Sequence, residues 1–351
     1  MLKKLLRRIS FTAVFWLCLG SHGLAQNQSK AVLMSALIEE QEKNGDFSGT
    51  VLVAEGDSTL LIKSAGFADR ETNKRNQAET KFNIASVGKL FTRILILKLI
   101  SEGKLGFEDR VGKFFNGFKE EASLITIRHL LNHRSGLGDI YISRKYLKGA
   151  FRSPADVVAL IAKEKPAFVP GSGNKYSNSG YYLLGAVISK ITGMPLAEAM
   201  EERLFAPLEM TGTGFASTGE LVPGHAVPYE RKGSVIRRTG MNTLGEPPTG
   251  AGSQYSTAGD LFKLYNSIIS DHKLLDEKSK AFLFNHFEPA DWNTVLHSKK
   301  IVGYVGGDTR GWSAKLTFMF LEKKIYGVAI LSNFDDMAHQ MDLKLREVIG
   351  K

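Results

Sequence analysis

The chain has 351 residues, of which 43% are hydrophobic and 23% are charged. This composition is that of an ordinary globular protein and excludes a disordered or fibrous chain. The formal net charge is +10, but acidic and basic residues are interleaved and no run of five basic residues occurs, which argues against a nucleic-acid surface. The length favours one large two-lobed domain or two smaller domains.

The first 25 residues differ from the rest of the chain. Four basic residues precede an apolar run over 9–20, and small residues follow up to Ala25. This is the pattern of a secretory signal peptide, and an apolar run of about 12 residues is too short to span a bilayer. We therefore expect residues 1–25 to be removed and the mature chain, 26–351, to be secreted, into the periplasm. An uncleaved membrane anchor is the alternative.

The signal segment also carries the only cysteine, Cys18, and four of the ten excess positive charges. The mature chain would then keep a net charge of +6 (10 − 4) and could form neither a disulfide nor a thiolate metal site.

Hydrophobic patterning predicts the elements that follow. Apolar residues recur at helical spacing over 30–43, and two β-rich runs separated by a turn follow at 47–54 and 59–63. The stretch 86–270 has mostly helical patterns broken by loops rich in Gly, Pro, Ser and Asn. Three further strands are predicted at 302–304, 314–322 and 325–332, and a closing amphipathic helix at 337–349.

Strands at both ends of a chain can form one sheet only if the helical middle is an insertion. We therefore predict one mixed α/β domain with a sheet lobe over about 26–85 and 295–351 and a helical lobe over about 86–294. The crevice between the lobes is the expected active site.

The start of the helical stretch carries a Ser-x-x-Lys pattern, Ser86 and Lys89. Residues three apart on a helix are neighbours, so the ammonium group can lie beside the hydroxyl, and desolvation would lower the lysine pKa toward neutrality. A neutral Lys89 could accept the Ser86 proton. The alternative is a helix N-cap serine followed by a solvated lysine.

A second pattern, Tyr176-Ser177-Asn178, lies after a Gly-rich and Pro-rich loop. A phenol can relay a proton when nearby cations favour its phenolate form. Asn178 offers an amide that can hold a substrate carbonyl and Lys89 together. Tyr176 could instead be a turn aromatic that caps the next helix.

Two other patterns are given structural roles. His129 and His133 have the spacing of two metal ligands on a helix, but no glutamate follows His129 and no third ligand is evident. The Gly-Ser-Gly at 171–173 lacks the surroundings of a phosphate-binding loop, and no Gly-x-Ser-x-Gly elbow occurs.

Together the motifs resemble the serine β-lactamase and penicillin-binding protein superfamily, in particular its branch of class C β-lactamases, D,D-peptidases and esterases. The resemblance extends from about residue 30 to 350. It implies a β-lactamase/transpeptidase-like fold, with an antiparallel sheet flanked by N- and C-terminal helices and an inserted, mostly helical lobe. The segments that carry it are FNIASVGK at 82–89, LLNHRSGL at 130–137, residues 170–185, FAPLEMT at 205–211 and GAGSQYSTAGDL at 250–261.

This family also has a third motif on a strand that edges the site: His or Lys, a small residue, then Gly. By this resemblance the corresponding residues of this chain are Tyr304, Val305 and Gly306. The backbone of Gly307 would complete an oxyanion hole together with the Ser86 N–H. The cation that would meet a substrate carboxylate is then missing. Arg310 could replace it, or could be a solvated loop residue.

The resulting prediction is an exported serine hydrolase with an acyl-enzyme on Ser86, acting as an esterase or peptidase on small acyl or D-amino-acid substrates. A β-lactamase or D-alanyl-D-alanine carboxypeptidase is the first alternative, and a non-catalytic binding relative is the second. The expected partner is a small acyl or peptide substrate, including a cell-wall peptide. No metal, cofactor, nucleic acid or stable membrane span is expected.

Overall fold

A computed structural model of the chain describes residues 28–143, 149, 153–216, 222–233, 235–240, 248–269, 274–284, 294, 301–321 and 324–350. The predicted signal segment 1–25 and the lobe boundary near 295 lie outside these residues.

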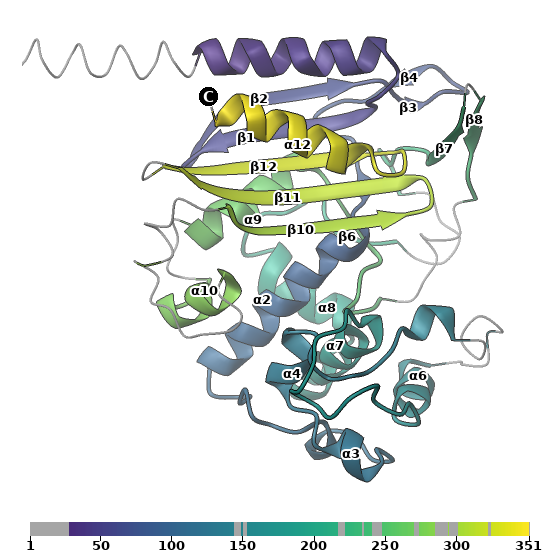
Figure 1. Cartoon of the computed structure of the whole chain (residues 1–351), viewed down its shortest axis with the longest axis vertical. Coiled ribbons are helices and arrows are strands. Elements are labelled where there is room, and N and C mark those ends of the chain that lie inside the picture. The colour runs from purple at the N-terminus through teal and green to yellow at the C-terminus, as the bar shows by residue number, and fades with distance from the viewer. Residues whose placement is uncertain are drawn as a thin grey trace, which may run out of the picture.

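A five-stranded sheet forms the upper layer of the molecule (Figure 1). Its order is β10-β11-β12-β1-β2, and every neighbouring pair is antiparallel, so strands from both ends of the chain share one sheet. This confirms the predicted fold class. The strands are β1 (Gly49–Glu55), β2 (Ser58–Ala65), β10 (Ile301–Thr309), β11 (Trp312–Leu321) and β12 (Lys324–Ser332).

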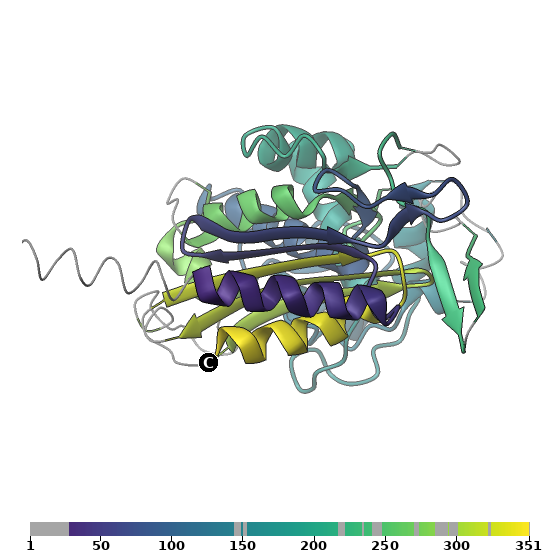
Figure 2. The same cartoon turned by 90° about the horizontal axis from the view of Figure 1, so that it is seen from above.

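The outer face of the sheet is covered by two helices from opposite ends of the chain. A helix over 28–43 and α12 (Met337–Ile349) lie side by side over the sheet and run along the direction of its strands (Figure 2). Their apolar stripes, which include Ile38 and Leu345, are buried against the sheet in one hydrophobic cluster.

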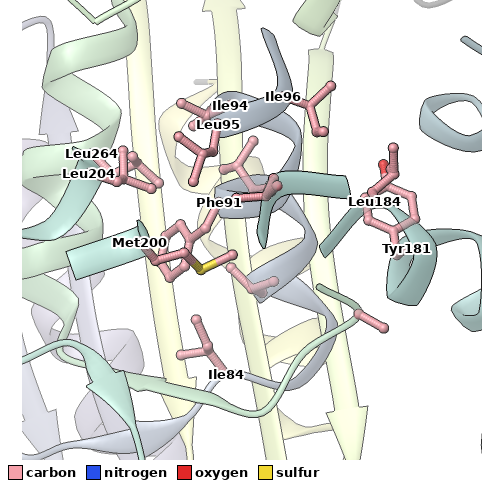
Figure 3. Close-up of a cluster of buried hydrophobic side chains, with 14 of the residues drawn as sticks. Ile84, Phe91, Ile94, Leu95, Ile96, Tyr181, Leu184, Met200, Leu204 and Leu264 are labelled. Carbon is pink, nitrogen blue, oxygen red and sulfur yellow. The ribbon is translucent and has the colours of Figure 1, made fainter. Parts of the chain in front are cut away.

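The inner face of the sheet packs against α9 (Ala258–Ile269), and the turn that holds Ser86 lies against β10 and β11. From that turn α2 (Gly88–Ser101) runs into the core of the molecule. From Phe91 to Leu97 every α2 residue is buried, including the polar Thr92 and Arg93, so this part of the helix lies inside the core on all sides. Figure 3 shows α2 between the strands and the helices of the lower lobe, with Phe91, Met200 and Leu204 in one cluster. Burial of this helix fixes the Ser86 turn against the sheet.

Short helices and turns build the lower lobe and the flanks of the site (Figure 1). The remaining α-helices are α3 (Glu120–Ser123), α4 (Ile127–Leu131), α6 (Pro154–Ile161), α7 (Asn178–Thr192), α8 (Leu196–Met200) and α10 (Glu277–Phe284). Short 3-10 helices are η1 (Ala85–Val87), η2 (Val111–Lys113) and η3 (Ile140–Ile142), and η4 (Glu201–Phe205) is a π-helix.

In the described part of the chain, seven short strands that the sequence did not predict form three small sheets. The sheet that matters for the site joins β5 to β9 and β9 to β6, so the strand just before Ser86 is held by a segment about 170 residues further on. The strands are β3 (Phe67–Asp69), β4 (Lys74–Arg75), β5 (Phe82–Asn83), β6 (Gly214–Phe215), β7 (Tyr229–Lys232), β8 (Val235–Arg238) and β9 (Gln254–Ser256).

The helix that follows the Tyr-Ser-Asn motif, α7, has a defined beginning and end. The Ser177 hydroxyl caps its first turn by accepting from the Gly180 N–H, and Gly193 ends it with a φ of 71°. Among the described residues no single helix is long and apolar enough to cross a membrane, although α7 and the helical stretch Leu196–Phe205 pass that test as a pair bent by 80°.

Candidate active site

The candidate nucleophile, Ser86, lies in the tight turn η1 between β5 and α2. The residue before it, Ala85, has a φ of +43°, which is an uncommon conformation for a residue with a side chain. The Asn83 side chain supports this conformation by accepting from the Ala85 N–H at 2.8 Å. Such strain costs on the order of 1–3 kcal/mol and clusters at functional sites.

The ammonium group of Lys89 lies beside the Ser86 hydroxyl. Its Nζ donates to Ser86 Oγ at 2.9 Å and to the backbone carbonyl of Ala251. Only 5% of Lys89 is exposed, and this burial lowers its pKa to about 7, although the nearby Asp139 carboxylate acts to raise it. Near neutral pH a large fraction of Lys89 is therefore uncharged and able to accept a proton.

The Tyr176 hydroxyl is the second group in contact with the nucleophile. It donates to Ser86 Oγ at 2.7 Å, and Lys89 Nζ lies 5.0 Å from the centre of the Tyr176 ring. Desolvation raises the pKa of Tyr176 to about 12, even though the hydrogen bond with Ser86 acts in the opposite direction. The site thus favours a neutral phenol at Tyr176 rather than the phenolate considered from the sequence, and makes Lys89 the base.

His133 holds the tyrosine in place. Its ring stacks on that of Tyr176 with centroids 4.6 Å apart, and its Nδ1 accepts from the Ser177 N–H at 3.1 Å. The other histidine of the pair, His129, caps α4 through Nδ1, which accepts from the Thr126 N–H. Among the described residues no cluster of three His, Cys, Asp or Glu side chains suited to a metal is found. The structural role predicted for both histidines agrees with these bonds.

Asn178 is the first residue of α7, and its amide group donates to Asp139 Oδ2 at 2.9 Å. The other oxygen of Asp139 accepts from the Tyr141 N–H, and the Tyr141 hydroxyl bonds Thr249. Sequence reasoning did not single out Asp139. The sequence signal for Asp139 is its position two residues after Leu137, the last residue of the 130–137 segment that carries the family resemblance.

Strand β10 brings its backbone against the nucleophile turn at Gly307. A Cβ added there would come within 2.4 Å of the Ser86 N and 2.6 Å of the Ile84 O, so only glycine allows this approach. At Gly306 an added Cβ would meet nothing closer than a Lys315 side-chain atom at 3.5 Å. The glycine that faces Ser86 is therefore Gly307.

Two cavities meet at Ser86. The larger, about 360 Å³, is lined by Lys89, Tyr176 and a set of apolar side chains. The smaller, about 220 Å³, is lined by Asn178 and other polar residues. A substrate carbonyl at Ser86 can therefore place one substituent in each cavity.

The sequence model of the Beta-lactamase family matches residues 34–350 of this chain. The chain belongs to this family. Its structural neighbours include proteins described as a hydrolase and as a D-amino acid amidase from Ochrobactrum anthropi.

The relatives of this β-lactamase-family chain carry several names. It is 29% identical to penicillin-binding protein 4* of Bacillus subtilis over 83% of this chain and 69% of that protein. Other curated relatives are matched over only 62–64% of their length, so the chain spans less than two thirds of those proteins.

Two solved structures of the same fold frame the comparison. A penicillin-binding protein from Bacillus halodurans has a TM-score of 0.76 and 25% identity, over 89% of this chain and 98% of that one. EstCE1, described as a hydrolase with promiscuous acyltransferase activity, has a TM-score of 0.78 and 20% identity, over 93% and 99%.

The position of Gly307 changes the register of the third family motif. If Gly307 is its glycine, the motif is Val305-Gly306-Gly307 and not Tyr304-Val305-Gly306, and the position that resemblance assigns to His or Lys is held by Val305. Val305 and Gly306 both line the larger cavity. The side chain of Tyr304 lies outside the described residues, so its predicted place in the site is not tested.

Arg310 does not supply the missing cation. Its guanidinium is 66% exposed and pairs with the Glu230 carboxylate at 3.0 Å. It is a surface ion pair, in keeping with the solvated alternative weighed from the sequence.

Proposed function

We propose that this protein is a serine hydrolase that forms an acyl-enzyme on Ser86 and then releases the acyl group to water. One observation carries the proposal: Ser86 Oγ is within hydrogen-bond distance of both Lys89 Nζ and the Tyr176 hydroxyl. A nucleophile in contact with a base whose pKa is near the working pH is the arrangement that acyl transfer requires.

In the proposed reaction neutral Lys89 takes the proton of Ser86 as Oγ attacks the carbonyl carbon. The Ser86 N–H and the β10 backbone at Gly307 would stabilise the oxyanion. Tyr176 then donates its hydroxyl proton to the leaving atom, and protonated Lys89 returns a proton to Tyr176, so that both groups end in their starting state. Asn178, whose side chain is held by Asp139, would orient the acyl part of the substrate from the smaller cavity.

An ester or an uncharged amide suits this site better than a substrate with an obligatory carboxylate, because Val305 takes the place of the cation. EstCE1 is named a hydrolase, which supports this choice. The second candidate is a β-lactamase or D-alanyl-D-alanine carboxypeptidase, favoured by the penicillin-binding proteins among the relatives.

The test compares hydrolysis of p-nitrophenyl acetate and of a penicillin by the protein and by Ser86→Ala. Ser101→Ala, at the exposed far end of α2, is the control for handling and folding. We expect ester hydrolysis that only Ser86→Ala abolishes. A full rate in Ser86→Ala would overturn the nucleophile assignment, and a penicillin rate well above the ester rate would favour the second candidate.

We also propose that the protein acts outside the cytoplasm, after cleavage before Gln26. The support is the signal-like pattern of residues 1–25. N-terminal sequencing of protein from a periplasmic extract tests it: a start at Gln26 is expected, and a start at Met1 in a membrane fraction would show an uncleaved anchor.

A further inference from the structure

The two cavities beside Ser86 differ in chemistry. Six apolar side chains line the larger one: Leu90, Leu131, Leu283, Phe284, Val305 and Phe318. The smaller one is lined instead mainly by polar or small residues, among them Asn83, Tyr141, Asn178, Gly252 and Ser253. Because the cavities adjoin the same hydroxyl, the two substituents of a substrate carbonyl meet different surroundings.

The positions of the proton-transfer groups decide which substituent goes where. Lys89 and Tyr176 both line the larger cavity. A leaving atom must receive its proton from a donor within hydrogen-bond reach. The leaving group therefore departs into the larger, apolar cavity, and the acyl substituent lies in the smaller, polar one.

The polar groups of the larger cavity are engaged with the protein. Arg93 donates to the Phe282 carbonyl at 3.3 Å and lies 3.5 Å from Asn132 Oδ1, and its guanidinium also interacts with Tyr181. The Asn174 amide group donates to the Asn132 carbonyl at 3.0 Å. A leaving group in this cavity would therefore meet the six apolar side chains as well as Lys89, Tyr176 and the guanidinium of Arg93.

We propose that the preferred substrates are esters of uncharged, apolar alcohols with a small acyl group. The inference rests on the proposed function, because it needs Ser86 as nucleophile. The Ser86 Oγ–C bond forms as the C–O bond to the alcohol breaks, the Ser86 proton leaves with the alcohol, and water then releases the acid.

The experiment measures kcat/KM for two series of esters. In the first the acyl group is acetyl and the alcohol grows from methanol to hexanol, with benzyl alcohol and glycolate added as aromatic and anionic cases. In the second the alcohol is ethanol and the acyl chain grows. We expect about a fourfold rise per methylene in the alcohol series, the gain from burying one CH2, until the cavity is full. Along the acyl series kcat/KM should stay constant or fall, and the glycolate ester should be a poor substrate.

Two test variants, each with its own control variant, sharpen the result. Val305→Lys should slow the hexyl ester at least tenfold and improve the glycolate ester, whereas Val305→Leu should keep the preference for apolar alcohols. Phe284→Ala should move the optimum to longer alcohols. Phe114→Ala is its matched control, because Phe114 is 9% exposed against 8% for Phe284 and lies against a different cavity.

The outcomes separate the two proposals. A rise with acyl length, or a flat alcohol series, in an enzyme that Ser86→Ala inactivates overturns the inference and leaves the proposed function standing. Absence of hydrolysis of every ester, together with no covalent adduct on Ser86, overturns the proposed function and the inference with it.

Discussion

The two sides of the candidate site contribute in different ways. The helix side, at the start of α2, supplies side chains that change protonation: Lys89 with a pKa lowered to about 7 lies 2.9 Å from Ser86. The strand side, at the end of β10, supplies the backbone of Gly307 and no titrating group that contacts Ser86 among the described residues. One side carries the proton, and the other fixes the space in which the oxyanion forms.

This difference means that the two sides should fail in different ways. On the helix side a substitution that keeps the shape but removes the base should stop the chemistry and leave the fold intact. On the strand side a single added carbon should block the approach to Ser86, although no functional group is lost.

The largest effect is expected from Lys89→Met, which keeps an unbranched side chain in the buried site and removes the base. We expect kcat to fall about 10³-fold, within the usual range for a lost general base. The melting temperature should be unchanged or higher, since no buried amine remains to be desolvated. A fall below tenfold would show that Lys89 is not the base.

A smaller loss is expected from Gly307→Ala, because its Cβ would lie 2.4 Å from the Ser86 N. We expect a loss of about 10²-fold in kcat, the cost of disturbing an oxyanion hole. Gly306→Ala is the matched control on the same strand, where the added carbon has room. Equal losses in both variants would contradict the register described here.

The pH profile tests the two groups that transfer protons, Lys89 and Tyr176. Only neutral Lys89 accepts a proton, so kcat/KM should rise tenfold per pH unit below about 7 and level off above it. Tyr176 has a pKa raised to about 12, so the plateau should extend well beyond pH 9. Asp139→Asn removes the charge that raises the Lys89 pKa and should move the rise to lower pH. A move to higher pH would contradict this.

The smallest effect is expected from His133→Ala, which removes the ring stacked on Tyr176. A stacked pair contributes about 0.5–1.5 kcal/mol, so kcat should fall about threefold to tenfold. His133→Phe should recover most of the loss, since it restores a ring. A similar loss in both variants would show that the Ser177 contact of His133 is the important one.

The sequence predicted the helix side well and the strand side poorly, for a physical reason. Ser86 and Lys89 are three residues apart, and helical spacing alone brings them together. On β10 three glycines, Gly303, Gly306 and Gly307, are available, and only the pairing with β11 decides which one meets Ser86.

Contacts between segments that are far apart in the sequence could not be predicted either. Asp139 meets Asn178 only because two loops fold over each other, and Lys89 meets the Ala251 carbonyl across 162 residues. Four strands of the central sheet were predicted because they are long and regular, whereas β10 was predicted only over 302–304 because its glycines interrupt the pattern. The two-residue and three-residue strands β5, β6 and β9 carry too few residues to show a period.

The most direct test of the central claim is to treat the protein with a fluorophosphonate, measure the intact mass, and map the modified peptide. The Ser101→Ala variant, treated in the same way, is the positive control, and the Ser86→Ala variant is the negative control. The account predicts one adduct, on Ser86, in the protein and in Ser101→Ala, and none in Ser86→Ala. An adduct that persists in Ser86→Ala, or a protein that turns over esters without ever being labelled, would contradict it.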